Sequence, residues 1–135
     1  CALEILGTSA NSVLLFSALG PDDPAISSTS AHMKALGLDP QTVGSRLGTQ
    51  QGLILRHLLE RTGLQRACVA GGDTCGYSAK QLGIYALETV VPIAPGAPLC
   101  RASSNQPRFE GLQISLKGGQ NGAADYFVKI REGGA

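Results

Sequence analysis

The sequence has no tryptophan, one methionine and only 4% aromatic residues, so its core must be built mainly from aliphatic side chains. Histidine is limited to His32 and His57, and no two of the four cysteines form a Cys-x-x-Cys pair. The scarcity of histidine and the absence of a Cys-x-x-Cys pair argue against a zinc site. Cys68 lies inside an apolar run and is expected to be a buried thiol, which indicates a reducing, cytoplasmic setting.

An excess of charge of either sign is also missing, because 11 basic and 10 acidic residues leave a formal net charge of +1. A near-neutral chain has no broad electrostatic attraction for nucleic acid or for an anionic membrane, so neither is expected as a partner. No apolar run reaches the length of a membrane span, and no basic-then-apolar signal peptide leads the chain. The chain begins at Cys1, in sequence that already looks structured, and we therefore expect a fragment of a longer protein.

The sequence does contain 43% apolar residues in short runs, over a length sufficient for one domain with a core. The apolar runs predict strands over residues 12–17, 66–70, 85–90, 99–102 and 112–116, the fourth of them at an edge of the sheet. Helices are expected over residues 31–36, 40–62, 74–82 and 124–131, and a rigid turn over residues 93–98. The alternation predicts an α/β layered sandwich with a mostly parallel or mixed sheet flanked by helices.

Three glycines are spaced four residues apart in the longest expected helix: Gly44, Gly48 and Gly52. They share one face of the helix, and each costs roughly 1 kcal/mol of helix stability relative to alanine. Close packing against a neighbouring element is the interpretation that we favour for this face, and direct contact with a ligand is the alternative. Gly63 is expected to end the same helix as a C-cap.

A first glycine-rich turn, Gly71-Gly72-Asp73-Thr74-Cys75-Gly76, follows the strand expected at 66–70. Its glycine spacing is that of a Walker A loop, but Tyr77 and Ser78 stand where that loop has lysine and a hydroxyl residue, so it is not a P-loop. Bare N–H groups at a helix start still attract phosphate oxygens. Asp73 or Thr74 can cap this helix, and the alternative role for Asp73 is an outer-sphere contact to Mg²⁺ or a contact to ribose.

A second glycine-rich turn, Lys117-Gly118-Gly119-Gln120-Asn121-Gly122, follows the strand expected at 112–116. Its lysine can place an ammonium group on phosphates while the glycine backbone donates hydrogen bonds. The alternative is a solvent-facing lysine before an ordinary loop. Because ligands of α/β folds sit at the carboxyl ends of strands, we expect the two turns to converge on one anion-sized pocket, which is typical of a nucleotide site.

The remaining polar residues give weaker indications of function. Asp22 and Asp23 are interpreted as a turn, with a Mg²⁺ site as the alternative. Asp125 is expected to cap or begin the last helix. Cys75 has no histidine nearby in the sequence to activate it, which argues against a catalytic thiol, and Tyr77 is expected to pack rather than to stack on a ligand.

The order of motifs resembles the C-terminal nucleotide-binding domain of the four-carbon acid sugar kinase family. The resemblance covers nearly the whole chain and is carried by Ser17–Asp23, Val69–Thr74, Leu82–Ile84, Ile93–Pro98 and Leu116–Phe127. It implies ATP with Mg²⁺ as cofactor, and contacts to ATP from two sets of residues: Gly71, Gly72, Asp73, Thr74 and Gly76 in the first turn, and Lys117, Gly118, Gly119 and Gly122 in the second. Cys75 stands where the family usually has serine, and because a thiol is a poorer hydrogen-bond donor, one phosphate contact is in question.

The resemblance further implies that the chain, residues 1–135, is a single nucleotide-binding domain and the C-terminal part of a two-domain kinase. Such kinases phosphorylate acids such as threonate, erythronate or 3-oxo-tetronate, which bind to the N-terminal domain, and a homodimer is a further expectation. This domain alone is then expected to be inactive. Some family members have been labelled type III effector proteins, so a non-catalytic binding module is an alternative, and a dinucleotide-binding domain is a weaker one because neither turn reads Gly-x-Gly-x-x-Gly.

Overall fold

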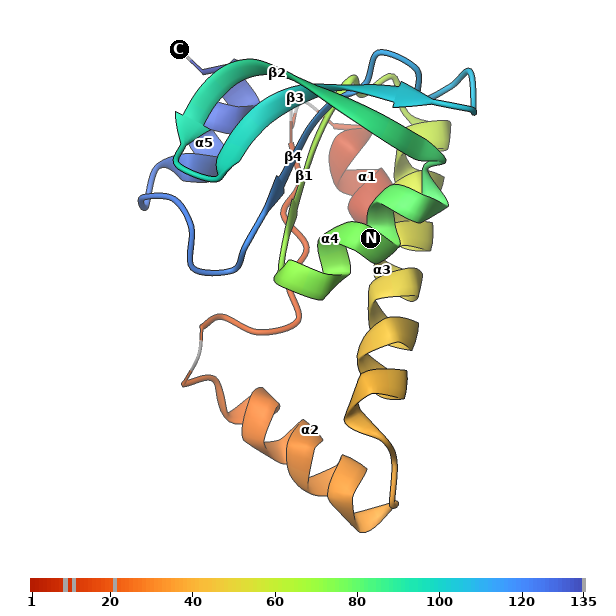
Figure 1. The fold of residues 1–135 in the computed structure, drawn as a ribbon, viewed down its shortest axis with the longest axis vertical. Coiled ribbons are helices and arrows are strands. Elements are labelled where there is room, and N and C mark those ends of the chain that lie inside the picture. Colours follow the sequence, from red (N-terminus) through yellow and green to blue (C-terminus); the bar gives the residue numbers. More distant parts are fainter. Residues whose placement is uncertain (9, 11, 21, 135) are drawn as a thin grey trace.

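A computed structural model describes residues 1–8, 10, 12–20 and 22–134 of the chain (Figure 1). Its elements in chain order are α1 (Ala2–Leu6), α2 (Pro24–Ala35), α3 (Pro40–Arg61), β1 (Arg66–Ala70), α4 (Gly72–Gln81), β2 (Ile84–Ala94), β3 (Ala97–Ser104), β4 (Gln113–Lys117) and α5 (Tyr126–Glu132). Helices flank a sheet, so the expected α/β class is confirmed.

The sheet is mixed, with the strand order β1-β4-β3-β2. Only β1 and β4 run parallel; β4 with β3, and β3 with β2, are antiparallel. The expectation of an edge strand at 99–102 is wrong, because β3 lies between β4 and β2. The expected turn at 93–98 contracts to Pro95 and Gly96, where Gly96 takes a φ of +69°, and the rest of that stretch joins the hairpin pairing.

The helices cover both faces of the sheet. Figure 1 shows α3 and α4 on one side of β1 and β4, and α5 on the other. Because strand side chains alternate between faces, two apolar clusters form. The larger, on the α3–α4 side, contains Leu59, Ala67, Leu82, Ala102, Phe109, Leu112 and Ile114. The smaller lies under α5 and contains Ala97, Leu99, Tyr126 and Ile130.

Helix α3 packs against α4 through two of its three spaced glycines. A Cβ atom at Gly52 would lie 2.8 Å from the Cα of Ser78, and one at Gly48 would lie 2.8 Å from Cδ2 of Tyr77. The interpretation of close packing is therefore confirmed for Gly48 and Gly52, and Tyr77 is a packing residue as expected. A Cβ at Gly44 would meet nothing within 4 Å, so packing does not explain that glycine.

Carboxylates at the helix starts explain where α2 and α3 begin. Asp39 accepts a hydrogen bond from the Thr42 N–H (2.8 Å) and starts α3 at the predicted place. Asp23 accepts one from the Ala25 N–H (2.9 Å), which confirms its place in a turn and starts α2 at Pro24, earlier than the sequence suggested. Gly63 is not the C-cap of α3; Thr62 holds that position in an extended conformation.

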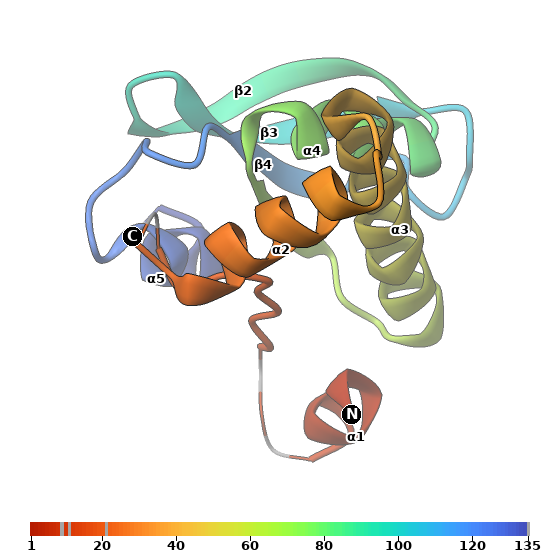
Figure 2. The same cartoon turned by 90° about the horizontal axis from the view of Figure 1, so that it is seen from below.

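The strand predicted over residues 12–17 is wrong for the described structure. These residues have no regular secondary structure, and the side chains of Leu14, Leu15 and Phe16 are 59%, 55% and 64% exposed. Figure 2 shows this segment between α1 and α2, leaving α1 apart from the sheet. An apolar run forms a strand only where it pairs with another strand, and in the described residues this run pairs with none, although β1 has an unpaired edge.

Candidate functional site

The two glycine-rich turns start side by side at one edge of the sheet. In the parallel pairing of β1 with β4, Ala70 is the register partner of Lys117. One residue further on, the Gly71 N–H donates to the Lys117 carbonyl oxygen over 2.9 Å. The two turns therefore start at the carboxyl ends of adjacent strands, as expected. Their convergence on one anion-sized pocket stays a prediction, because the cavity described below is lined by Gly122 alone of the residues in the two turns.

The first turn is shorter than expected, because α4 begins at Gly72 with Gly71 as its N-cap. Gly71 has a φ of +134°, and no side chain in the described part of the chain caps this helix. The expectation that Asp73 or Thr74 caps it is therefore wrong, because both lie inside the first helical turn, two and three residues after the N-cap. The Cys75 N–H donates to the Gly71 carbonyl (3.0 Å), whereas the N–H groups before it have no acceptor within the helix.

Space for a ligand lies beside Gly72, where an added Cβ would meet nothing within 4 Å. Gly72 and Asp73 are exposed and Thr74 is half-buried, so these first helical amides face an accessible edge. Gly76 lies deeper in α4, where an N–H normally donates to the carbonyl four residues earlier. The accessible donors of the first turn therefore come from residues 72–74 rather than from the whole 71–76 segment.

The Cys75 side chain contacts the ends of the two strands from which the turns start. Its thiol lies 3.4 Å from the carbonyl oxygens of both Val69 and Lys117, at the ends of β1 and β4. Burial raises the pKa of the Cys75 thiol, and it raises that of neighbouring Cys68 to about 11. Neither is a thiolate at neutral pH, which fits the expectation that Cys75 is not a nucleophile.

Lys117 is buried, with 5% of its surface exposed, so the alternative of a solvent-facing lysine is wrong. Its ammonium donates to the carbonyls of Gly118 (2.9 Å) and Gly119 (3.0 Å). It also lies 5.5 Å from the ring centre of Tyr126 and 5.9 Å from that of Phe127. The backbone of the second turn thus wraps around the Lys117 ammonium, and this charge adds a positive potential beneath the turn.

The rest of the second turn is shaped by glycine and asparagine. The Asn121 N–H donates to the Gly118 carbonyl (3.1 Å) and closes the turn. Gly122 takes a φ of +94°, and a Cβ there would lie 2.5 Å from Cδ2 of Tyr126, so this position accepts only glycine. Gly119 is exposed with open space beside it, as Gly72 is.

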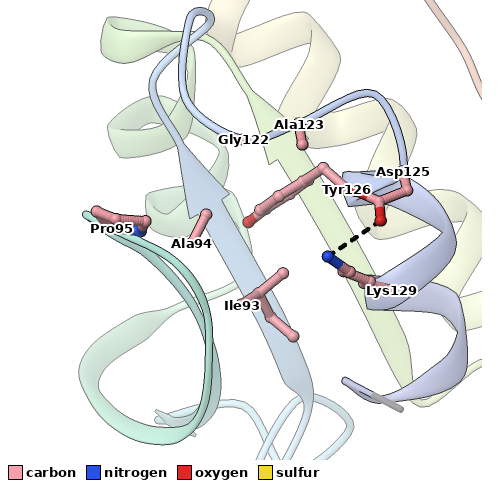
Figure 3. A pocket seen from close by; sticks show the side chains of 8 residues that line it. All are labelled: Ile93, Ala94, Pro95, Gly122, Ala123, Asp125, Tyr126 and Lys129. Carbon is pink, nitrogen blue, oxygen red and sulfur yellow. Dashed lines mark ion pairs between the residues drawn. The ribbon is translucent and has the colours of Figure 1, made fainter.

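A cavity of about 320 Å³ adjoins the second turn (Figure 3). Its lining comes from three segments: the end of β2 with its turn, the loop after β4, and the start of α5. The lining residues are Ile93, Ala94, Pro95, Gly122, Ala123, Asp125, Tyr126 and Lys129. Gly122 belongs both to the second turn and to this wall, so the cavity borders the second turn, whereas none of its lining residues comes from the first turn.

Tyr126 forms a fixed wall of the cavity. It is 2% exposed, and its hydroxyl group donates to the Ala97 carbonyl (3.0 Å) and is 2.5 Å from the Ser115 hydroxyl. In Figure 3 its side chain runs from α5 between Gly122 and Ala94. A ring held at both ends cannot swing to fill the cavity.

Asp125 begins the last helix, as the sequence predicted, but its side chain does not cap it. It stands at the N-cap position of α5, yet its carboxylate makes no capping hydrogen bond. The carboxylate instead pairs with the Lys129 ammonium over 3.0 Å at the cavity (Figure 3). The spacing of four residues between the two was the available signal, since residues at i and i+4 of a helix are neighbours.

Sequence comparison identifies the class of this domain. The sequence profile described as "nucleotide-binding C-terminal domain" matches residues 2–127. The chain therefore belongs to this family of nucleotide-binding C-terminal domains, and the resemblance to four-carbon acid sugar kinases is confirmed.

Among its relatives is the 3-oxo-isoapionate kinase of Paraburkholderia graminis, which is 47% identical over 90% of this chain and 26% of that protein. The 3-oxo-tetronate kinase of Pseudomonas savastanoi pv. phaseolicola is 33% identical over 95% of the chain and 27% of its own length. The chain thus spans about a quarter of the length of these curated relatives.

A solved structure with the same fold is a domain of unknown function from Bordetella bronchiseptica, crystallised with bound citrate as a domain-swapped dimer. Its TM-score is 0.57 at 21% sequence identity, and the match covers 97% of this chain and 36% of that one. At this identity the likeness concerns the fold.

Across residues 1–8, 10, 12–20 and 22–134, three or more His, Cys, Asp or Glu side chains nowhere gather as a metal site would require. Within the same residues, each helix is too short or too polar to span a bilayer.

Proposed function

We propose that this chain binds ATP at its two glycine-rich turns. The observation that carries the proposal is the hydrogen bond from the Gly71 N–H to the Lys117 carbonyl, which joins the turns at the ends of two parallel strands. The free amides of residues 72–74 and the buried Lys117 charge favour an anion, and the open space at Gly72 and Gly119 admits phosphate oxygens to the backbone. Membership of the nucleotide-binding family supports the same ligand.

The residues expected to contact ATP then divide by role. Gly72, Asp73 and Thr74 supply the amides of the first turn, and Gly118 and Gly119 supply the backbone of the second. Gly71 and Gly122 permit the two backbone paths through their positive φ angles rather than donate to phosphate. Gly76 lies inside α4, where its N–H is used within the helix. Lys117 acts through its charge and by shaping the turn, because its ammonium is occupied by the turn carbonyls.

We further propose that the whole protein is a kinase for four-carbon sugar acids, with this chain as its C-terminal domain. The named activities of the relatives support the substrate class, which includes 3-oxo-tetronate. Magnesium would arrive with the nucleotide and neutralise phosphate charge during transfer. The sugar acid would bind to the N-terminal domain, so this chain alone would hold nucleotide without turning over. All four cysteines are free thiols, which supports a cytoplasmic protein.

A homodimer is also proposed. The run from Val13 to Phe16 is largely exposed, and in the described structure β1 stands at the edge of the sheet with one side unpaired. Exposed apolar chain beside an unpaired strand edge favours strand exchange between two copies. The domain-swapped dimer formed by the structural neighbour supports this arrangement.

The proposal of ATP binding is tested with Gly72→Val. This substitution adds side-chain atoms where the structure has open space and an ordinary helical backbone, so the fold should survive while phosphate is kept from the amides. We expect the affinity for ATP·Mg²⁺, measured by isothermal titration calorimetry, to fall at least about tenfold, as for loss of a charge-assisted hydrogen bond. Lys117→Ala should weaken binding too, because it removes the cation and leaves two turn carbonyls without their donor.

Gly44→Val is the matched control, because it makes the same change at an exposed helical glycine with open space, far from both turns in sequence. It should leave ATP affinity unchanged. A wild-type chain whose melting temperature does not rise with ATP·Mg²⁺ would favour the non-catalytic module instead, since a ligand that binds only the folded state must stabilise it. Equal ATP affinity in the wild type and in Gly72→Val would contradict the assignment of the first turn.

A further inference from the structure

We propose that the cavity beside the second turn binds the ribonucleoside part of the nucleotide, with the Asp125 carboxylate accepting hydrogen bonds from the ribose hydroxyls. This inference rests on the proposed binding of ATP and adds to it a position for the sugar and base. It gives a role to residues that the glycine turns leave unused.

Position is the first argument. Gly122 ends the second turn and lines the cavity, so the cavity adjoins the turn that is proposed to hold phosphate. The Gly96 turn of the β2–β3 hairpin lies on the far side, where an added Cβ would be 3.4 Å from Nδ2 of Asn121. The hairpin turn at Gly96 therefore contacts the second glycine-rich turn at Asn121. The cavity lies beside this contact, between the end of β2 and the loop after β4.

Size and lining are the second argument. A volume of about 320 Å³ falls at the lower end of the range of small-molecule sites. The side chains of Ile93, Ala94 and Pro95 form an apolar wall suited to the flat face of a base. Tyr126 is held by Ser115 and Ala97, so the opposite wall is rigid before any ligand arrives.

The third argument is the chemistry of Asp125. An aspartate at an N-cap position normally accepts a hydrogen bond from the first turn of its helix, but this one does not. Its carboxylate is exposed at the cavity and held there by Lys129 at 3.0 Å. A carboxylate accepts hydrogen bonds at both oxygens and donates none, which matches the two adjacent hydroxyl groups of a ribose.

The test compares three ligands in the presence of Mg²⁺: ATP, 2′,3′-dideoxy-ATP and inorganic tripolyphosphate. In the wild-type chain we expect calorimetry to show ATP binding about tenfold tighter than dideoxy-ATP, as for loss of hydrogen bonds to a charged group. In Asp125→Ala, ATP affinity should fall by the same factor and match that of dideoxy-ATP, because the partner of the hydroxyls is gone. Tripolyphosphate affinity should be equal in both proteins.

Two controls separate the carboxylate from its surroundings. Glu132→Ala removes a carboxylate that also lies in α5 and pairs with Arg131, but does not line the cavity, and it should change none of the affinities. Lys129→Ala breaks the ion pair between Lys129 and Asp125 but keeps the Asp125 carboxylate, so ATP should still be preferred over dideoxy-ATP.

Ala94→Leu tests the cavity itself, because the larger side chain fills it from its apolar wall. We expect this variant to weaken ATP binding but not tripolyphosphate binding.

Failure of the ribonucleoside site and failure of the proposed ATP binding would give different results. Equal affinity of the wild type for ATP, dideoxy-ATP and tripolyphosphate would overturn the ribonucleoside site and leave phosphate binding at the turns intact. A loss of tripolyphosphate binding in Asp125→Ala would overturn it too, because that result assigns Asp125 a structural role. Failure of the wild type to bind any of the three would contradict the nucleotide proposal itself.

Discussion

At the scale of single residues, burial decides what the chemically active side chains of this domain do. Lys117 and Cys75 both lie at the end of the sheet, and both are held by backbone carbonyl groups. A lysine in a glycine-rich turn suggests a direct phosphate contact when only the sequence is read. Its 5% exposure shows that the charge acts from below the turn surface.

Cys68 allows a prediction about pH at this scale. Burial raises the pKa of its thiol from the ordinary 9.0 to about 11, so in the window between these values the unfolded chain loses this proton while the folded chain keeps it. The contribution of this thiol to stability is complete below pH 9.0 and is lost as the pH rises to about 11. We expect urea denaturation curves to show stability falling across that window, and the fall to be smaller in Cys68→Ala. Parallel pH profiles for the two proteins would contradict this.

At the scale of elements, α3 and α4 illustrate how one residue type serves two purposes. Gly48 and Gly52 let the helices approach, whereas the Gly71 N-cap and Gly72 free the start of α4. The same α4 thus rests on α3 along one face and presents its first amides at the end of the sheet. Rigid support of this kind keeps a binding turn in place without a ligand.

Gly52→Ala and Gly44→Ala form a matched pair that tests this packing. The new Cβ at Gly52 would stand 2.8 Å from the backbone of Ser78, and overpacking of this kind costs about 1–3 kcal/mol, so the free energy of unfolding should fall. At Gly44 the new methyl meets open space, and the gain in helix propensity should raise stability by about 1 kcal/mol. Thermal or urea unfolding measures both. Similar effects at the two positions would mean that α3 does not pack on α4 through Gly52.

At the scale of the whole molecule, the largest feature not explained by the fold is the exposed run from Val13 to Phe16. The three most exposed of its side chains would ordinarily be covered in a folded protein. The segment is apolar enough for a strand, and β1 is an edge strand of the described sheet. The proposed homodimer would cover this run and pair the free edge of β1.

Phe16→Asp tests the proposed dimer. A charge at the end of the apolar run, in place of its most exposed side chain, should prevent the run from being buried, so the wild type is expected to sediment as a dimer and this variant as a monomer. Tyr85→Asp is the control, because Tyr85 is 73% exposed on β2, at the opposite edge of the sheet. A wild type that stays monomeric over a wide range of concentration in analytical ultracentrifugation would refute the dimer.

Much of the candidate site and part of the fold could be predicted from sequence, and the division follows the range of the forces involved. The strand at residues 66–70, the start of α3 at Asp39 and the two glycine turns depend on neighbours in the chain, so local chemistry determined them. The central place of β3, the burial of Lys117 and the position of Asp125 at a cavity depend on strand pairing and packing between distant segments. Only the tertiary structure decided these, because a residue's exposure and partners arise from contacts that no local pattern encodes.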